Sequence, residues 1–188
     1  MGLISFITTG ILLAYLVLNI AYSIKLKHIA IVDIVIIAIG FVLRLFVGST
    51  VTDTPLSMWI VIMTFLLALF IALAKRRDDV IIYNETGQKM RKVVGGYNLQ
   101  FIETSMSIMA SVTLVAYIIY TTSDRVIQHF HSEYLYLTSL FVIIGILRYL
   151  QITFVNEDSG SPTKIILSDH FIQLALLGWI LSFAWILY

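Results

Sequence analysis

Five charged residues stand together at the end of a long apolar stretch. In the segment IALAKRRDDV, Lys75, Arg76, Arg77, Asp78 and Asp79 directly follow a continuous apolar run. Arginine guanidinium groups bind phosphate oxygens through paired hydrogen bonds, and lysine binds them as a point charge. A neighbouring carboxylate can hold Mg²⁺, which also bridges phosphates. One hypothesis for the cluster is therefore a phosphate clamp with a carboxylate beside it that holds a metal. The alternative is a solvated anchor where a helix leaves a membrane, with Lys75–Asp79 and Arg76–Asp79 pairs one turn apart.

A second polar group precedes this cluster in the chain. Asn19, Tyr22 and Ser23 have i, i+3 and i+4 spacing, so they line one face of a helix. Lys27 and Asp33 follow shortly after them. We expect these groups to converge with the charge cluster at one mouth of a helix bundle. Hydrogen bonding between neighbouring membrane helices would explain the first three residues equally well.

Four ionisable residues fall inside apolar stretches: Asp33, Arg44, Glu103 and Arg148. Such residues are costly in a bilayer and usually face the interior of a bundle. Asp33 has a short side chain that reaches the membrane surface poorly, so we expect it to face a polar cavity. Arg44 shares its helix face but lies roughly 16 Å away along the axis, too far for a direct pair. For Arg44 and Arg148, extension to the membrane surface and an interhelical ion pair both remain open.

The composition is that of an integral membrane protein. The 188 residues are 60% hydrophobic and only 12% charged, whereas soluble domains are nearer a quarter charged. A net charge of +1 gives no reason to expect nucleic acid as a partner, and the absence of cysteine excludes thiol chemistry. We predict an all-α bundle in a single domain, residues 1–188. Its six spans are 3–23, 28–49, 56–75, 103–122, 134–155 and 170–188.

The positive charges predict how the spans are oriented. Lysines and arginines gather in the first, third and fifth connections, which hold Lys25, Lys27, the residues 75–92 and Lys164, while the opposite connections hold only Arg125. This bias predicts that the richer set faces the cytoplasm of a plasma-membrane protein. Both termini would then lie outside. The first segment lacks a positive start, so we read it as a retained span rather than a signal peptide.

Five segments, in this order, resemble one enzyme family. They are YSIKLKHIAIVDIVIIAIGFVLRLFVGS (22–49), LAKRRDD (73–79), GGYNLQFIETSMSIMASVTLVAYIIYT (95–121), GILRYL (145–150) and GSPTKIILSD (160–169). Together they resemble the polyprenyl-phosphate phosphoribosyltransferase branch of the UbiA prenyltransferase superfamily. The resemblance implies a bundle of about nine helices with a cytoplasmic active site. It also implies transfer of 5-phosphoribose from phosphoribosyl pyrophosphate to a polyprenyl phosphate, with Mg²⁺.

The resemblance assigns roles to individual residues. In this branch a lysine–arginine–arginine–any–glutamate motif corresponds to residues 75–79, with Asp79 where the family usually has glutamate. The phosphate-binding residues that the motifs imply are Tyr22, Lys27, Lys75, Arg76 and Arg77. The catalytic carboxylates are Asp33, which would position a sugar hydroxyl, and Asp79, which would assist the metal.

The sequence departs from the family at its first motif. The family's asparagine–aspartate–x–x–aspartate–x–x–x–aspartate run is absent, and the chain resembles the C-terminal two-thirds, helices four to nine. We therefore expect activity to require a second chain that supplies this motif. Two alternatives stay open: a UbiA-type enzyme that prenylates an aromatic or quinone acceptor, and a non-catalytic fragment. A transporter ranks last, because the charges gather toward one mouth rather than at the midplane.

Overall fold

A computed structural model describes residues 2–87, 91–155 and 162–187, and every regular element among them is helical. These residues form two compact units, residues 1–105 and 106–188, which are treated separately below. The long helices are α1 (Gly2–Ile24), α2 (Val32–Thr52), α3 (Met58–Thr86), α4 (Leu99–Thr122), α6 (Ser139–Phe154) and α8 (His170–Leu187). The short ones are η1 (Leu26–His28), η2 (Lys92–Gly96), α5 (Asp124–Phe130), η3 (Tyr134–Thr138) and α7 (Pro162–Ser168). The all-α fold class is confirmed, whereas the single domain stays a prediction.

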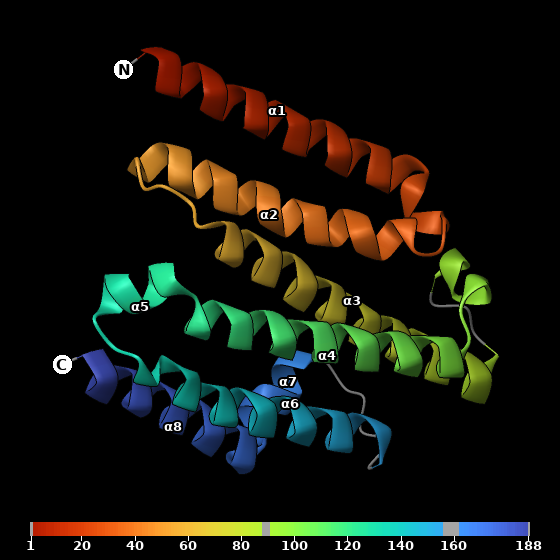
Figure 1. Cartoon of the computed structure of the whole chain (residues 1–188). Helices are drawn as coiled ribbons and strands as arrows, with labels where there is room; N and C mark the ends of the chain where they lie inside the picture. The colour runs from red at the N-terminus through yellow and green to blue at the C-terminus, as the bar shows by residue number, and fades with distance from the viewer. Residues whose placement is uncertain (1, 88–90, 156–161, 188) are drawn as a thin grey trace. The chain divides into compact units, whose positions relative to one another are not determined.

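In the first unit, α2 packs between α1 and α3 (Figure 1). Helix α2 ends at Asp53, which adopts a left-handed conformation, and Pro55 follows two residues later. A left-handed cap followed by proline is a common helix stop. The η1 turn between α1 and α2 contacts η2, the turn that precedes α4. Helices α1 and α2 also contact η1, and α3 contacts η2. The predicted site residues of all three helices therefore lie near these two turns.

Helix α3 is longer than the sequence predicted. It continues without a break through Lys75–Asp79 to Thr86 and ends at Gly87, where φ is +69°. Glycine adopts this conformation without the steric cost that a Cβ would add. The predicted third connection, residues 76–102, therefore begins as helix. The charged cluster projects from a rigid element rather than from a loop.

In the second unit, α6 packs against α8, and η3 also contacts α8 (Figure 1). A buried polar link fixes this contact: Trp179 Nε1 donates to Tyr117 Oη at 2.7 Å, and Tyr117 Oη lies 2.8 Å from Thr138 Oγ1. Helices α7 and α8 meet at an angle of 80°. Arg148 of α6 holds this bend, since its Nη2 donates to Asp169 Oδ2 at 2.7 Å. The ion-pair alternative for Arg148 is thus confirmed.

The helices are long and apolar enough to cross a bilayer. Among the described residues there are five candidate spans, or six if α7 and α8 form one broken span. Large apolar side chains such as Phe6, Val17 and Leu181 are exposed on these helices, as expected for surfaces that face lipid. The candidate spans indicate an integral membrane protein, and the cytoplasmic orientation stays a prediction.

Candidate functional site

The centre of the candidate site is an ion pair between α2 and α3. Asp33 in the first turn of α2 is 0% exposed, and Arg76 of α3 is 2% exposed. Arg76 Nε donates to Asp33 Oδ2 at 2.6 Å. The close packing of α2 on α3 brings the two residues together across 43 positions of sequence. Breaking a buried pair by removing one partner costs about 3–5 kcal/mol, so this pair also secures the fold.

Tyr97 occupies the other oxygen of Asp33. Its hydroxyl donates to Asp33 Oδ1 at 2.6 Å and accepts a hydrogen bond from the backbone N–H of Ile31 at 2.7 Å. Burial, together with the hydrogen bond to Asp33, raises the pKa of Tyr97 above its ordinary value. The tyrosine therefore remains a neutral donor. Tyr97 directly follows η2, so its two hydrogen bonds connect η2 to the start of α2.

The turn that Tyr97 holds has an unusual backbone. Ile31, the residue before α2, has φ +70° and ψ −48°. A β-branched residue rarely adopts positive φ, and such positions cost on the order of 1–3 kcal/mol. Nearby, a Cβ on Gly96 would lie only 2.8 Å from the Cβ of Ala30. The approach of η2 to this turn is thus close enough to require glycine at position 96.

Asp79 and Arg91 extend the cluster. Asp79 Oδ2 accepts from Arg76 Nη1 at 2.8 Å and lies 3.4 Å from Nε of Arg91, which is half exposed. The predicted Arg76–Asp79 pair is present, but Arg76 is buried rather than solvated. Asp33, Arg76, Tyr97, Asp79 and Arg91 are called the Asp33 cluster below.

Arg77, the neighbour of Arg76, forms a separate pair. Its Nε donates to Glu103 Oε1 at 2.9 Å, and its Nη2 lies 2.8 Å from the same oxygen. The Arg77 side chain is 2% exposed, whereas that of Glu103 is 31% exposed. Both arginines of the sequence motif are therefore buried and matched by carboxylates. The interpretation of this stretch as a solvated surface anchor is wrong for Arg76 and Arg77.

Three predicted phosphate-binding residues lie outside this hydrogen-bonded network. Tyr22 in the last turns of α1 and Lys27 in η1 are half-buried, and Lys75 is exposed on α3. Within the described part of the chain, no hydrogen bond or ion pair connects these side chains to the Asp33 cluster. The predicted Lys75–Asp79 pair is not formed. Because neither lysine is paired with a carboxylate among the described residues, both can bind an anion.

Sequence reasoning did not find Tyr97 or Arg91. Tyr97 lies 64 residues from Asp33, and nothing in the local sequence connects them. The Gly95–Gly96 pair before Tyr97 was an indirect signal of a close approach. Glu103 was identified as an ionisable residue in a span, but its partner was not.

A magnesium site requires several oxygen ligands with near-octahedral geometry. Among the described residues, no three Asp, Glu or His side chains are grouped closely enough to hold a metal ion. The Oδ2 of Asp79 already contacts two arginines. The part of the chain that the structure describes therefore does not fit Mg²⁺ by itself. The role of Asp79 as a metal ligand stays a prediction that the geometry does not support.

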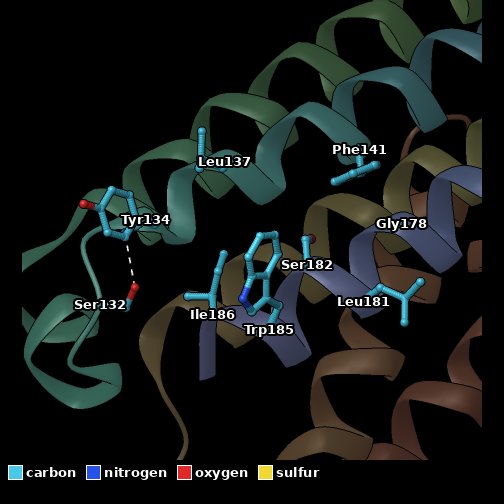
Figure 2. A pocket seen from close by; sticks show the side chains of 9 residues that line it. All are labelled: Ser132, Tyr134, Leu137, Phe141, Gly178, Leu181, Ser182, Trp185 and Ile186. Atoms are coloured by element: carbon cyan, nitrogen blue, oxygen red, sulfur yellow. Dashed lines mark hydrogen bonds between the residues drawn. The ribbon is translucent and has the colours of Figure 1, made fainter. Parts of the chain in front are cut away.

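The second unit contains a pocket of about 720 Å³ between η3–α6 and α8 (Figure 2). Phe141, Leu181, Trp185 and Ile186 give it an apolar wall, and no charged side chain lines it. Figure 2 shows Gly178 of α8 beside the Phe141 ring. No predicted site residue lies here. The pocket is suited to hydrocarbon rather than to a charged substrate.

No family model matches the chain. The chain is, however, similar to several curated proteins named decaprenyl-phosphate phosphoribosyltransferase. The identity is 29% over 176 residues for the Mycolicibacterium smegmatis protein, with coverage of 90% of this chain and 55% of that protein. It is 26% for the Corynebacterium glutamicum protein, with coverage of 95% and 55%. It is also 26% for the Mycobacterium tuberculosis protein, with coverage of 90% and 55%.

The chain thus spans about half the length of the curated relatives it matches, where the resemblance implied two-thirds. The similarity covers nearly all of this chain, so it includes the Asp33 cluster and the Arg77–Glu103 pair. The predicted resemblance is confirmed: the chain is a distant homologue of decaprenyl-phosphate phosphoribosyltransferases.

Proposed function

We propose that this chain forms part of a membrane transferase that moves 5-phosphoribose from phosphoribosyl pyrophosphate to a polyprenyl phosphate. The names of the relatives support this activity, and the similarity extends over 90% of the chain. The observation that carries the proposal is the arginine pair Arg76–Arg77, buried on a rigid helix and braced by carboxylates from α2, α3 and α4. Paired arginines of this kind hold the site in a fixed geometry, so the cations around them can stabilise the charge on a leaving pyrophosphate without reorganising.

The chemistry balances as a single displacement at the anomeric carbon of the ribose. An oxygen of the lipid phosphate forms a bond to C1, the bond from C1 to the pyrophosphate oxygen breaks, and pyrophosphate leaves with the electron pair. No proton has to be removed from an ionised lipid phosphate. The demands on the protein are therefore orientation of the two anions and stabilisation of the leaving charge.

The ion pairs of the site indicate which residues orient the anions and which hold the site in place. Arg76 and Arg77 are matched by carboxylates, so their guanidinium groups act mainly as fixed elements of the site. Lys27 and Lys75 have no such partner among the described residues, and we assign them to direct contact with phosphates. Tyr22 is assigned to the same task. Each oxygen of Asp33 accepts one hydrogen bond and retains a second lone pair. That lone pair is the one we assign to a ribose hydroxyl.

Activity in this proposal also needs acidic groups that the described residues do not supply. A second polypeptide with an aspartate-rich motif is the partner that we propose for this purpose. It would bring the oxygen ligands that Mg²⁺ requires. No step above depends on how that metal is held.

The test is transfer of radiolabelled phosphoribose from phosphoribosyl pyrophosphate to decaprenyl phosphate in membranes. One arm contains this chain alone, and the other contains this chain with a membrane protein that carries the aspartate-rich motif. We expect transfer in at least the second arm. Lys27→Gln should raise the KM for the donor about tenfold with little change in kcat, as expected for a group that contributes to binding alone.

Arg76→Lys should lower kcat by about 100-fold, because lysine keeps the charge but cannot reach both carboxylates. Arg125→Gln, which removes an exposed arginine far along the chain from the site, is the matched control and should leave both constants unchanged. Absence of labelled lipid in both arms, with the chain folded, would refute the proposal. A prenylated aromatic product would instead establish the UbiA-type alternative.

A further inference from the structure

Arg44 has an environment unlike that of the other arginines in the spans. Its Nε and Nη2 donate to Tyr15 Oη of α1 at 3.1 and 2.6 Å. The guanidinium carbon lies 5.3 Å from the ring centre of Tyr15 and 5.1 Å from that of Phe41. Arg44 is thus held by one neutral hydroxyl and two ring faces. Of the two explanations that the sequence offered, the ion pair is not found within the described residues, and extension to the membrane surface stays a prediction.

The position of Arg44 is deep within its helix. At 1.5 Å per residue, its Cα lies about 18 Å from Val32 and about 12 Å from Thr52, the two ends of α2. Helical side chains lean toward the N-terminus, which here is the more distant end. The hydrogen bonds to Tyr15 hold the Arg44 side chain in this orientation, toward the N-terminus of α2. The guanidinium therefore lies toward the middle of α2 rather than toward its nearer end.

No carboxylate compensates this charge among the described residues. Three carboxylates within or beside the long helices already form ion pairs with other arginines: Asp33 with Arg76, Glu103 with Arg77, and Asp169 with Arg148. A tyrosine hydroxyl orients the guanidinium but carries no counter-charge. A charge at this depth is costly in hydrocarbon unless it is paired.

The same face of α1 carries a second exposed polar group. Asn19, one turn from Tyr15, is exposed and donates from Nδ2 to the backbone oxygen of Tyr15 at 2.8 Å. Around it, Leu12, Leu16 and Ile20 are exposed apolar residues. Polar side chains within an apolar surface are the usual contacts between membrane helices.

We propose that Arg44, Tyr15, Phe41 and Asn19 form a docking face for a transmembrane helix of another polypeptide that carries a carboxylate at mid-depth. Charge complementarity is the argument. A second copy of this chain does not fit, because Asp33, Asp79 and Glu103 of its described helices are in ion pairs. Its Asp78 and Glu85 lie toward the C-terminal end of α3, about 30 Å or more from Met58, and not at mid-depth. A lipid headgroup lies at the bilayer surface, whereas Arg44 lies roughly 12 Å or more along the helix from either end. The proposal does not depend on transferase activity.

The test uses synthetic transmembrane peptides in phosphatidylcholine vesicles. The chain contains no cysteine, so a single Val51→Cys substitution at an exposed position carries one fluorophore. The partners are a leucine–alanine helix with glutamate at its centre and its glutamine twin. Energy transfer should show that the glutamate peptide binds about tenfold more tightly, since a paired charge replaces an unpaired one.

Arg44→Gln should abolish this preference, and Arg125→Gln should retain it. The charge swap is the sharpest arm: Arg44→Glu should bind a peptide with a central arginine in place of the glutamate peptide. Circular dichroism and gel filtration establish that each variant is folded. Equal binding of the two peptides to the unsubstituted chain would overturn the proposal. So would an Arg44-dependent affinity for phosphatidylglycerol without a preference for glutamate, which would identify a lipid phosphate as the occupant.

Discussion

At the scale of single residues, the main finding is that Asp33 has a donor on each oxygen. Arg76 and Tyr97 approach from α3 and from the residue after η2, and the carboxylate has no contact with solvent. A substrate hydroxyl must therefore reach Asp33 through a change in the surrounding side chains. The arginines next to it are structural supports of the site as well as charges.

Tyr97→Phe tests this network. The substitution leaves Asp33 Oδ1 without its donor and the N–H of Ile31 without its acceptor. We expect a loss of about 1–3 kcal/mol in the free energy of unfolding, measured by denaturation in detergent, because each buried polar group that loses its partner is costly. Tyr136→Phe, at an exposed hydroxyl, should change stability by less than about 0.5 kcal/mol.

The pH dependence of the same pair of proteins gives an independent check. The pKa of Tyr97 is raised in the folded state, so its neutral form stabilises the fold fully below the unfolded pKa of about 10. That contribution is lost as the pH rises through the higher folded value. The stability difference between the unsubstituted chain and Tyr97→Phe should therefore be constant from neutral pH to about 10 and shrink above it. A difference that shrinks below pH 9 would contradict the assignment.

At the scale of elements, the contact between α6 and α8 depends on small residues. A Cβ at Gly178 would collide with the Phe141 ring, whereas a Cβ at Gly145 on the facing helix would meet the Cβ of Ala175 at 4.0 Å, an ordinary contact. The two glycines therefore occupy the same helix pair but differ in the space around them.

Gly178→Ala should destabilise the protein by about 1–3 kcal/mol, the usual cost of overpacking a fitted contact. Gly145→Ala is the matched control and should be neutral or slightly stabilising, because alanine is the better helix former. Thermal unfolding in detergent measures both. Equal melting temperatures for the two variants would show that Phe141 moves aside at little cost.

The sequence predicted the existence of the long helices correctly, because runs of about 20 apolar residues have few alternatives. Some helix ends were also close: the start of α4 and the end of α6 fall within four residues of the predictions. The end of α3 was missed because the charged residues from Arg76 onward were taken as a connection. Those residues are good helix formers apart from the aspartates, and Gly87 was the actual stop signal.

The site was predicted only in part, for a physical reason. An ionisable residue within an apolar run is visible in a single sequence, so Asp33, Arg44, Glu103 and Arg148 were all identified. The partner of such a charge depends on which helices pack together, and that information is not local. Tyr97 and Arg91 were therefore found only from the fold.

At the scale of the whole molecule, the distribution of positive charge predicts the orientation in the membrane. Because the chain lacks cysteine, single cysteines at the exposed residues Asn84 and Gln128 report on opposite sides. In intact cells, Gln128→Cys should react with an impermeant maleimide, and Asn84→Cys should react only after lysis. The reverse pattern would contradict the predicted topology and place the Asp33 cluster outside the cell.

The length of α3 has a consequence for the lipid environment. Its 29 residues extend about 43 Å, well beyond a hydrocarbon core of about 30 Å. Counted from Met58, Arg76 lies about 27 Å along the axis, just where the acyl chains give way to headgroups. Hydrophobic mismatch should therefore act on the exposed part of the site: a thicker bilayer draws the Lys75 ammonium toward hydrocarbon, and a thinner one leaves it in water. Arg76 and Arg77 stay buried in their ion pairs in either case. Acyl-chain length would then tune this site as a mutation does.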